Sequence, residues 1–261
     1  MRYVWDYHES YLSEIKPRGF MKIATRIALS YLRLWDRQAA DRPDFLLANS
    51  RFTLARIRKY YRREASVIYP GALSLAEKTE SVLVSDEQGT ERTHFLIVSR
   101  LTRSKKVDIA IEAFNKLGLP LVIVGTGPEE ERLKRIAKDT IRFVGFQDDV
   151  SLARLYRSAR AVIFPPEEDF GMVAAEALSF GTPVIAFEYG GIREIVEPGV
   201  TGELFDAQTP EILAEGVRRF LTQEENGGYD REHMKRSVAR FTKAAFQEEF
   251  GKFLEAASHR S

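Results

Sequence analysis

From His94 onward, short apolar segments alternate with amphipathic segments, and this alternation restricts the fold more than any other feature of the sequence. Short apolar segments are typical of buried strands, whereas apolar residues spaced three and four apart indicate helices. Repeated strand–helix units predict a parallel sheet covered by helices on both faces, that is, an α/β fold. The strands are expected at residues 94–99, 121–125, 141–145, 161–164, 184–186 and 202–205.

The front of the chain follows a different pattern. A long helix is expected over residues 20–40, with Ile23, Ile27 and Leu34 on its apolar side. A second helix, capped by Ser50, should lie between two short strands. Two strands and two helices are too few for a complete domain of about 100–150 residues. We therefore expect a remnant of one domain at 1–72, a polar linker at 73–92, a complete domain at 93–222 and C-terminal helices at 223–261.

The charges are distributed unevenly, although the net charge of the 261 residues is only +1. Residues 1–72 carry 14 Lys and Arg against 7 Asp and Glu, a net charge of +7, and residues 73–261 carry 25 against 31, a net charge of −6. The basic segment suits contact with an anionic membrane or a polyphosphate acceptor, or it is a solvated helix surface. Both alternatives remain open.

The composition excludes several classes of protein. The chain has no cysteine, which rules out disulfides and thiolate metal sites and favours a reducing compartment such as the cytoplasm. No run of 18 or more apolar residues is present, so no membrane-spanning helix is expected.

The segment with most chemical information is FPPEEDFGMVAAEALSFGTPVIA, at residues 164–186. Glu168 should lie on the loop after a strand, and Glu176 in the first turns of the following helix. A helix start offers free N–H groups and a positive dipole end to phosphate, whereas carboxylates suit hydroxyl groups. Hydroxyls beside phosphate indicate a nucleotide sugar. The alternative is an acidic loop that caps an ordinary helix.

The order Glu168-Asp169-Phe170-Gly171, followed by Glu176, resembles the E-G-F-G…E signature of retaining GT-B glycosyltransferases of the group 1 type. Asp169 replaces a glycine but removes no ligand side chain. The resemblance implies two facing Rossmann-like domains, the second of which binds most of the donor and the first most of the acceptor. Residues 1–72 look like the end of the first domain in mannosyltransferase-like members, so most of that domain would be absent.

A basic loop, Ser99 to Lys106, follows the first strand of the complete domain. The resemblance implies that Arg100 and Lys105 hold the donor diphosphate, although basic loops are more often simply solvated. Lys106 stands where the family commonly has glycine. By the same resemblance, Glu168 accepts from hydroxyls of the donor sugar and Glu176 from those of the ribose.

Backbone groups complete the expected donor site. The N–H groups of Phe170, Gly171 and Met172 would hold sugar and phosphate oxygens, and Gly190 and Gly191 would lie near the diphosphate. A simple turn explains this glycine pair equally well.

A second turn, Gly145-Phe146-Gln147-Asp148, resembles the family's contact with the nucleobase, to which Gln147 is assigned. The alternative for this turn is a helix cap with a packed Phe146.

The expected function is transfer of a hexose from a nucleotide sugar to a saccharide or lipid-linked acceptor, with retained configuration. GDP-mannose is the favoured donor on resemblance alone. No metal ion is expected, because neither a D-x-D motif nor a metal-ligand spacing of histidines occurs. No further cofactor and no nucleic-acid partner are expected either. A non-catalytic nucleotide-sugar binding protein, or half of a split enzyme that needs a partner chain, is the alternative. A dinucleotide-dependent oxidoreductase does not fit, since no G-x-G-x-x-G follows the first strand of the complete domain.

Overall fold

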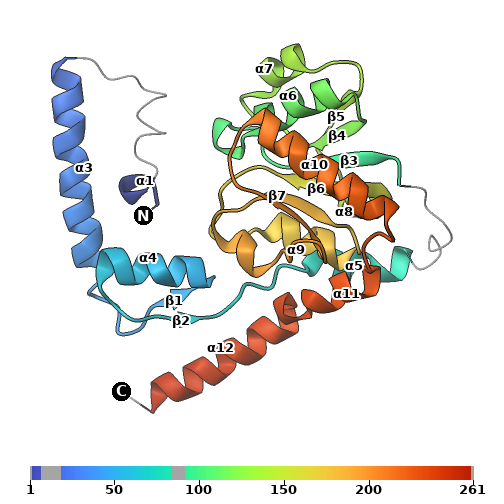
Figure 1. Cartoon of the computed structure of the whole chain (residues 1–261). Helices are drawn as coiled ribbons and strands as arrows, with labels where there is room; N and C mark the ends of the chain where they lie inside the picture. The colour runs from blue at the N-terminus through green and yellow to red at the C-terminus, as the bar shows by residue number, and fades with distance from the viewer. Residues whose placement is uncertain (1, 7–18, 84–91, 260–261) are drawn as a thin grey trace. The chain divides into compact units, whose positions relative to one another are not determined.

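A computed structural model describes residues 2–6, 19–83 and 92–259 (Figure 1). The chain divides into two compact units, residues 1–67 and residues 68–261. The predicted division at residue 72 therefore lies slightly later than the division found in the structure.

The second unit contains a six-stranded, entirely parallel sheet with the order β5-β4-β3-β6-β7-β8. Numbered within the sheet, this is the order 3-2-1-4-5-6 of the Rossmann fold. The predicted α/β fold with a complete Rossmann-like sheet is thus confirmed. The strands are β3 (His94–Val98), β4 (Leu121–Val124), β5 (Ile141–Gly145), β6 (Ala159–Phe164), β7 (Val184–Phe187) and β8 (Gly202–Phe205).

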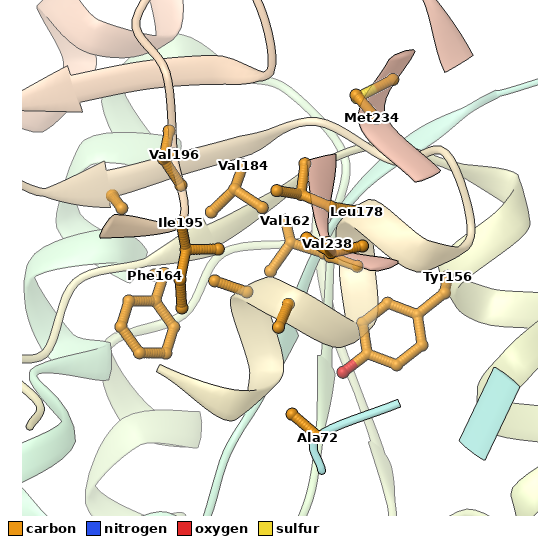
Figure 2. Close-up of a cluster of buried hydrophobic side chains, with 14 of the residues drawn as sticks. Ala72, Tyr156, Val162, Phe164, Leu178, Val184, Ile195, Val196, Met234 and Val238 are labelled. Carbon is orange, nitrogen blue, oxygen red and sulfur yellow. The ribbon is translucent and has the colours of Figure 1, made fainter. Parts of the chain in front are cut away.

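Helices cover both faces of the sheet, because successive strand residues point to opposite faces and both sets are apolar. Leu96 of β3 belongs to a buried cluster on one face, while Phe95 and Ile97 belong to the cluster on the other. Figure 2 shows part of the first cluster, which includes Tyr156, Val162 and Leu178. The helices of this face are α5 (Ser74–Leu83), α8 (Asp149–Ser158), α9 (Met172–Ser179) and α11 (Arg231–Ser237). Those of the opposite face are α6 (Val107–Leu117), α7 (Glu130–Ile136) and α10 (Pro210–Glu225).

The strand order reverses between β3 and β6, which are neighbours at the centre of the sheet. The chain leaves β3 toward α6 on one face, and it leaves β6 toward α9 on the other. In open parallel sheets, ligands bind at the carboxyl ends of the strands at such a reversal. The topology therefore brings the loops that follow Val98 and Phe164 to the position where a ligand is expected.

The linker predicted at residues 73–92 is wrong for its first half, which forms helix α5. Leu75 and Thr79, one helical turn apart, are both buried, and α5 packs against α8 and α9. The Thr79 hydroxyl donates to the carbonyl of Leu75 at 2.8 Å, so its burial leaves no unsatisfied hydroxyl. Residues 84–91 lie outside the described part of the chain. The expected C-terminal helices are α11 and α12 (Lys243–Ser258).

The first unit contains α1 (Arg2–Trp5), α3 (Phe20–Ala39) and α4 (Arg51–Tyr61), with β1 (Leu47–Ala48) and β2 (Ser66–Val67) paired in parallel. Asp36 of α3 is buried and accepts hydrogen bonds from Trp5 Nε1 and Tyr61 Oη, each at 2.8 Å. Ser50 caps α4, as predicted, by accepting from the N–H of Thr53 at 3.0 Å.

Many apolar side chains of α3 remain exposed in this unit. Ile23, Ile27 and Leu34 have exposed fractions of 58%, 66% and 57%. None of the described helices, α3 included, combines the length and the apolar character that crossing a membrane requires.

Candidate functional site

The loops after β3 and β6 meet through an ion pair. Lys105 lies at the end of a short 3₁₀ helix, Arg103–Lys105, and its Nζ donates to Oε1 of Glu168. Both side chains are partly exposed, at 31% and 23%. The two groups are therefore at the reversal of the strand order and accessible to a ligand.

The rest of the basic loop contains an exposed charged residue, Arg100, and a buried apolar residue, Leu101. Leu101 is buried and its N–H donates to the carbonyl of Thr126 at 2.9 Å, which fixes the loop against the turn after β4. Arg100 is exposed and has no ion-pair partner among the described residues. Lys106 has φ +54° and ψ +32°, a left-handed conformation that favours glycine.

The loop after β6 ends at the start of α9. Phe170 is buried against Tyr69 and Phe241, with ring centroids 6.1 and 5.0 Å away. Gly171 has φ +107°, and because it has no side chain, it leaves the first N–H groups of α9 without a cap. Met172, the first residue of the helix, is exposed. The helix therefore begins shortly after Glu168 without a side-chain cap, and the N–H of Ala174 donates to the carbonyl of Gly171 at 3.0 Å.

The glycine pair lies directly against this loop. The N–H of Gly191 donates to the carbonyl of Glu168 at 2.9 Å, and Gly190 forms an isolated parallel bridge with the same residue. A Cβ atom at position 191 would be 2.3 Å from the carbonyl oxygen of Asp169. The pair holds the Glu168 loop in place, so the turn has at least this structural role.

Glu176 lies in α9 and contacts Tyr156 of α8. The hydroxyl of Tyr156 donates to Glu176 Oε2 at 3.0 Å. Burial raises the pKa of the Glu176 carboxyl above its ordinary value, the hydrogen bond from Tyr156 lowers the pKa, and the negative charge of Asp149 raises it. No Lys, Arg or His of the described chain forms an ion pair with this carboxylate.

Two interpretations were given for the turn after β5: a contact with the nucleobase through Gln147, or a helix cap with a packed Phe146. Phe146 is 82% exposed, so the expectation of a packed Phe146 is wrong, although Asp148 does cap α8 by accepting from the N–H of Ser151 at 2.9 Å. The Nε2 of Gln147 donates to the carbonyls of Val144 and Phe146, at 2.7 and 3.0 Å. The Gln147 side chain thus fixes the shape of the turn, and the exposed ring is that of Phe146.

The structure brings Lys105, Glu168, Gly190 and Gly191 into direct contact, whereas Glu176 contacts Tyr156 instead. Tyr156 was not expected in the site. A buried tyrosine hydroxyl usually requires a hydrogen-bond partner, but the burial of Tyr156 is evident only in the structure. In the regions that the structure describes, no cluster of three or more histidine and acidic side chains could hold a metal ion.

Comparison with known proteins identifies the family of this chain. The model of the family described as "Glycosyl transferases group 1" matches residues 83–240. An uncharacterized glycosyltransferase of Methanocaldococcus jannaschii is 35% identical over 137 residues, which cover 49% of this chain and 35% of that protein. A D-inositol 3-phosphate glycosyltransferase of Corynebacterium urealyticum is 26% identical over 242 residues, which cover 80% of this chain and 56% of that protein. The chain thus spans about half the length, or less, of these relatives.

Solved structures show the same fold. Sucrose-phosphate synthase from Thermosynechococcus elongatus matches 88% of this chain and 62% of its own, with a TM-score of 0.74 and 24% identity. HepE of Anabaena, in complex with UDP-glucose, matches 86% of this chain and 67% of its own, with a TM-score of 0.69 and 20% identity.

Proposed function

Because this chain belongs to the family of group 1 glycosyl transferases, we propose that it binds a nucleotide sugar and provides the donor site for transfer of a hexose with retained configuration. The ion pair between Lys105 and Glu168 carries the proposal. It places a cation and a hydroxyl acceptor together at the carboxyl edge of the sheet, beside the uncapped start of α9. A sugar diphosphate needs both kinds of group.

The proposed roles follow from the charges. Arg100, Lys105 and the first N–H groups of α9 stabilise the negative charge that builds on the leaving diphosphate. Glu168 accepts from hydroxyls of the donor sugar, and Glu176 accepts from those of the ribose. Since protein groups supply this positive charge, we propose that transfer proceeds without a metal ion, and a rate that survives chelation by EDTA would support this.

The proposal also covers the identity of the donor and of the acceptor. GDP-mannose is proposed from the resemblance of the front segment to mannosyltransferase-like proteins, while UDP-glucose is the ligand of the HepE structure. The acceptor is proposed to be a saccharide or a lipid-linked saccharide. The absence of cysteine in the sequence agrees with a cytoplasmic location. The excess of basic residues in 1–72 supports peripheral contact with anionic lipid.

Titration calorimetry tests the donor site with UDP, UDP-glucose, GDP and GDP-mannose. Lys105→Ala is expected to weaken binding of the preferred donor by about 10- to 150-fold, the usual effect of a lost charged hydrogen bond. Lys116→Ala is the matched control, because Lys116 forms an exposed ion pair with Glu211 at the opposite end of α6. Equal binding by the Lys105 variant and the wild type would place the donor elsewhere.

A second candidate is the donor-binding half of a split transferase. Such a chain binds donor but transfers sugar only with a partner chain that supplies the acceptor side. Transfer at about 1 per second or faster by the chain alone would exclude this candidate.

A further inference from the structure

Tyr156 is held rigidly at the base of the candidate ribose site. The residue is fully buried, and its ring stacks on Phe180 with centroids 5.4 Å apart and planes inclined by 10°. Its backbone carbonyl accepts from Thr182 Oγ1 at 2.6 Å. The ring and the backbone are both fixed, so the hydroxyl has a defined position in which it donates to Glu176 Oε2.

This hydrogen bond leaves most of the accepting capacity of Glu176 unused. An ionised carboxylate has about four lone-pair sites on its two oxygens, and the Tyr156 hydroxyl occupies one of them. The carboxylate is partly buried and has no cation beside it in the described chain. A buried charge in this situation is unfavourable unless further donors reach it. The hydroxyls of a ligand are donors of the required kind.

We propose that Tyr156 is a positioning residue for nucleotide recognition: its hydroxyl holds Glu176 Oε2 and thereby directs Oε1 toward the ribose hydroxyls. The inference rests on the proposed function, since it assumes a nucleoside diphosphate in this site. Tyr156 itself does not touch the ligand. Loss of its hydroxyl frees the Glu176 side chain to rotate, so the ribose loses a fixed acceptor although the carboxylate remains.

The chain contains a matched control for this arrangement. Tyr229 donates to Glu203 Oε1 at 3.2 Å, and its ring stacks on Phe220 with centroids 5.3 Å apart and planes inclined by 9°. Glu203 lies near the start of β8, whereas the candidate site lies at the carboxyl ends of the strands. Tyr229→Phe therefore removes an equivalent tyrosine–glutamate hydrogen bond away from the site.

The experiment compares binding of UDP and of GDP with binding of their 2′,3′-dideoxy forms. Wild type, Tyr156→Phe, Tyr229→Phe, Glu176→Gln and the double variant Tyr156→Phe/Glu176→Gln are titrated, and their melting temperatures are recorded. The wild type is expected to prefer the hydroxylated nucleotide by about 10-fold or more. Tyr156→Phe should reduce this preference several-fold without changing the affinity for the dideoxy nucleotide. Tyr229→Phe should leave the preference unchanged, and Tyr156→Phe should have no further effect in the Glu176→Gln background.

The outcomes separate the inference from the function on which it rests. A melting temperature that falls in Tyr156→Phe while the ribose preference stays at the wild-type value would show that the tyrosine only packs, and would overturn the inference. Equal loss of affinity for the hydroxylated and dideoxy forms would overturn it as well. A wild type that binds no nucleotide at all would overturn the proposed function, and the inference with it.

Discussion

The backbone of Gly190 lies against the carbonyl oxygen of Glu168: a Cβ atom at position 190 would be only 2.1 Å from that oxygen. Gly190 also has φ +96°, which side-chain-bearing residues rarely adopt. The loop that carries Glu168 is therefore fixed by a contact that only glycine permits. This contact links the turn after β7 to the carboxylate of the candidate donor site.

Gly190→Ala should consequently lower both stability and donor binding. The backbone strain alone is expected to cost about 1–3 kcal/mol of unfolding free energy, and the clash should displace the Glu168 loop. Urea unfolding and nucleotide titration measure the two effects. Gly251→Ala is the control, because a Cβ there meets nothing within 4 Å and alanine should stabilise the interior of α12 by about 0.5–1 kcal/mol. Wild-type behaviour of Gly190→Ala would contradict the packing described here.

Lys106 provides a second test of local strain. A left-handed conformation costs a residue with a side chain about 1–2 kcal/mol. Glycine avoids this strain, but its greater conformational freedom in the unfolded chain offsets part of the stabilisation. Lys106→Gly is therefore expected to raise the unfolding free energy by about 0.5 kcal/mol, and Lys106→Val to lower it by about 1 kcal/mol. Chemical denaturation measures both. Destabilisation by glycine would mean that contacts of the lysine side chain outweigh the strain.

Glu176 should make donor binding depend on pH. The ionised carboxylate is the form that accepts ribose hydroxyls, and burial raises its pKa in the folded protein. Binding is therefore expected to be full above the raised pKa and to weaken as the pH falls through it. Titrations of UDP and GDP from pH 7.5 to pH 4.5 measure this change. Binding by Glu176→Gln should not show this pH dependence. The variant therefore distinguishes the titration of Glu176 from that of histidines and of the nucleotide phosphate.

The Glu176 carboxyl also makes the unfolding free energy depend on pH, but in the direction opposite to its effect on binding. A folded-state pKa above the unfolded value means that the folded protein binds the proton more tightly, so unfolding free energy falls as the pH rises through that interval. Glu176→Gln is thus expected to raise the melting temperature at pH 7 more than at pH 4, measured without nucleotide. An equal effect at both pH values would show that the Glu176 carboxyl is not destabilised by its burial.

The sheet could be predicted from the sequence because its strands are short, mostly apolar segments bounded by turn residues. Helix α5 was not predicted, since its buried residues, Leu75 and Thr79, are one apolar and one polar residue and so produce no apolar periodicity. The exposure of Phe146 was also not predictable. An aromatic residue in a turn packs or projects according to the backbone around it, which here is fixed by the hydrogen bonds of Gln147.

The candidate site, too, could be predicted from the sequence only in part. The positions of Lys105 and Glu168 after neighbouring strands follow from the strand order, because parallel strands end at one edge of the sheet. The contact between Tyr156 and Glu176 depends on how α8 and α9 pack on the sheet, and no spacing in the sequence encodes that packing. Stacking on Phe180, which fixes the tyrosine ring, depends on the same tertiary arrangement.

The exposed side chains of α3 lead to the last prediction, which concerns association. Ile23, Ile27 and Leu34 are more than half exposed, and contiguous apolar surface of this kind favours contact with another surface. We expect the purified chain to self-associate through this helix, and Ile27→Lys to shift it toward the monomer in multi-angle light scattering. Arg26→Lys, a neighbouring change that keeps the charge, should leave association unchanged. A wild-type chain that is monomeric at high concentration would contradict the prediction. Monomers that sediment with anionic vesicles, and fail to do so when Ile27 is replaced, would assign the same face to a membrane.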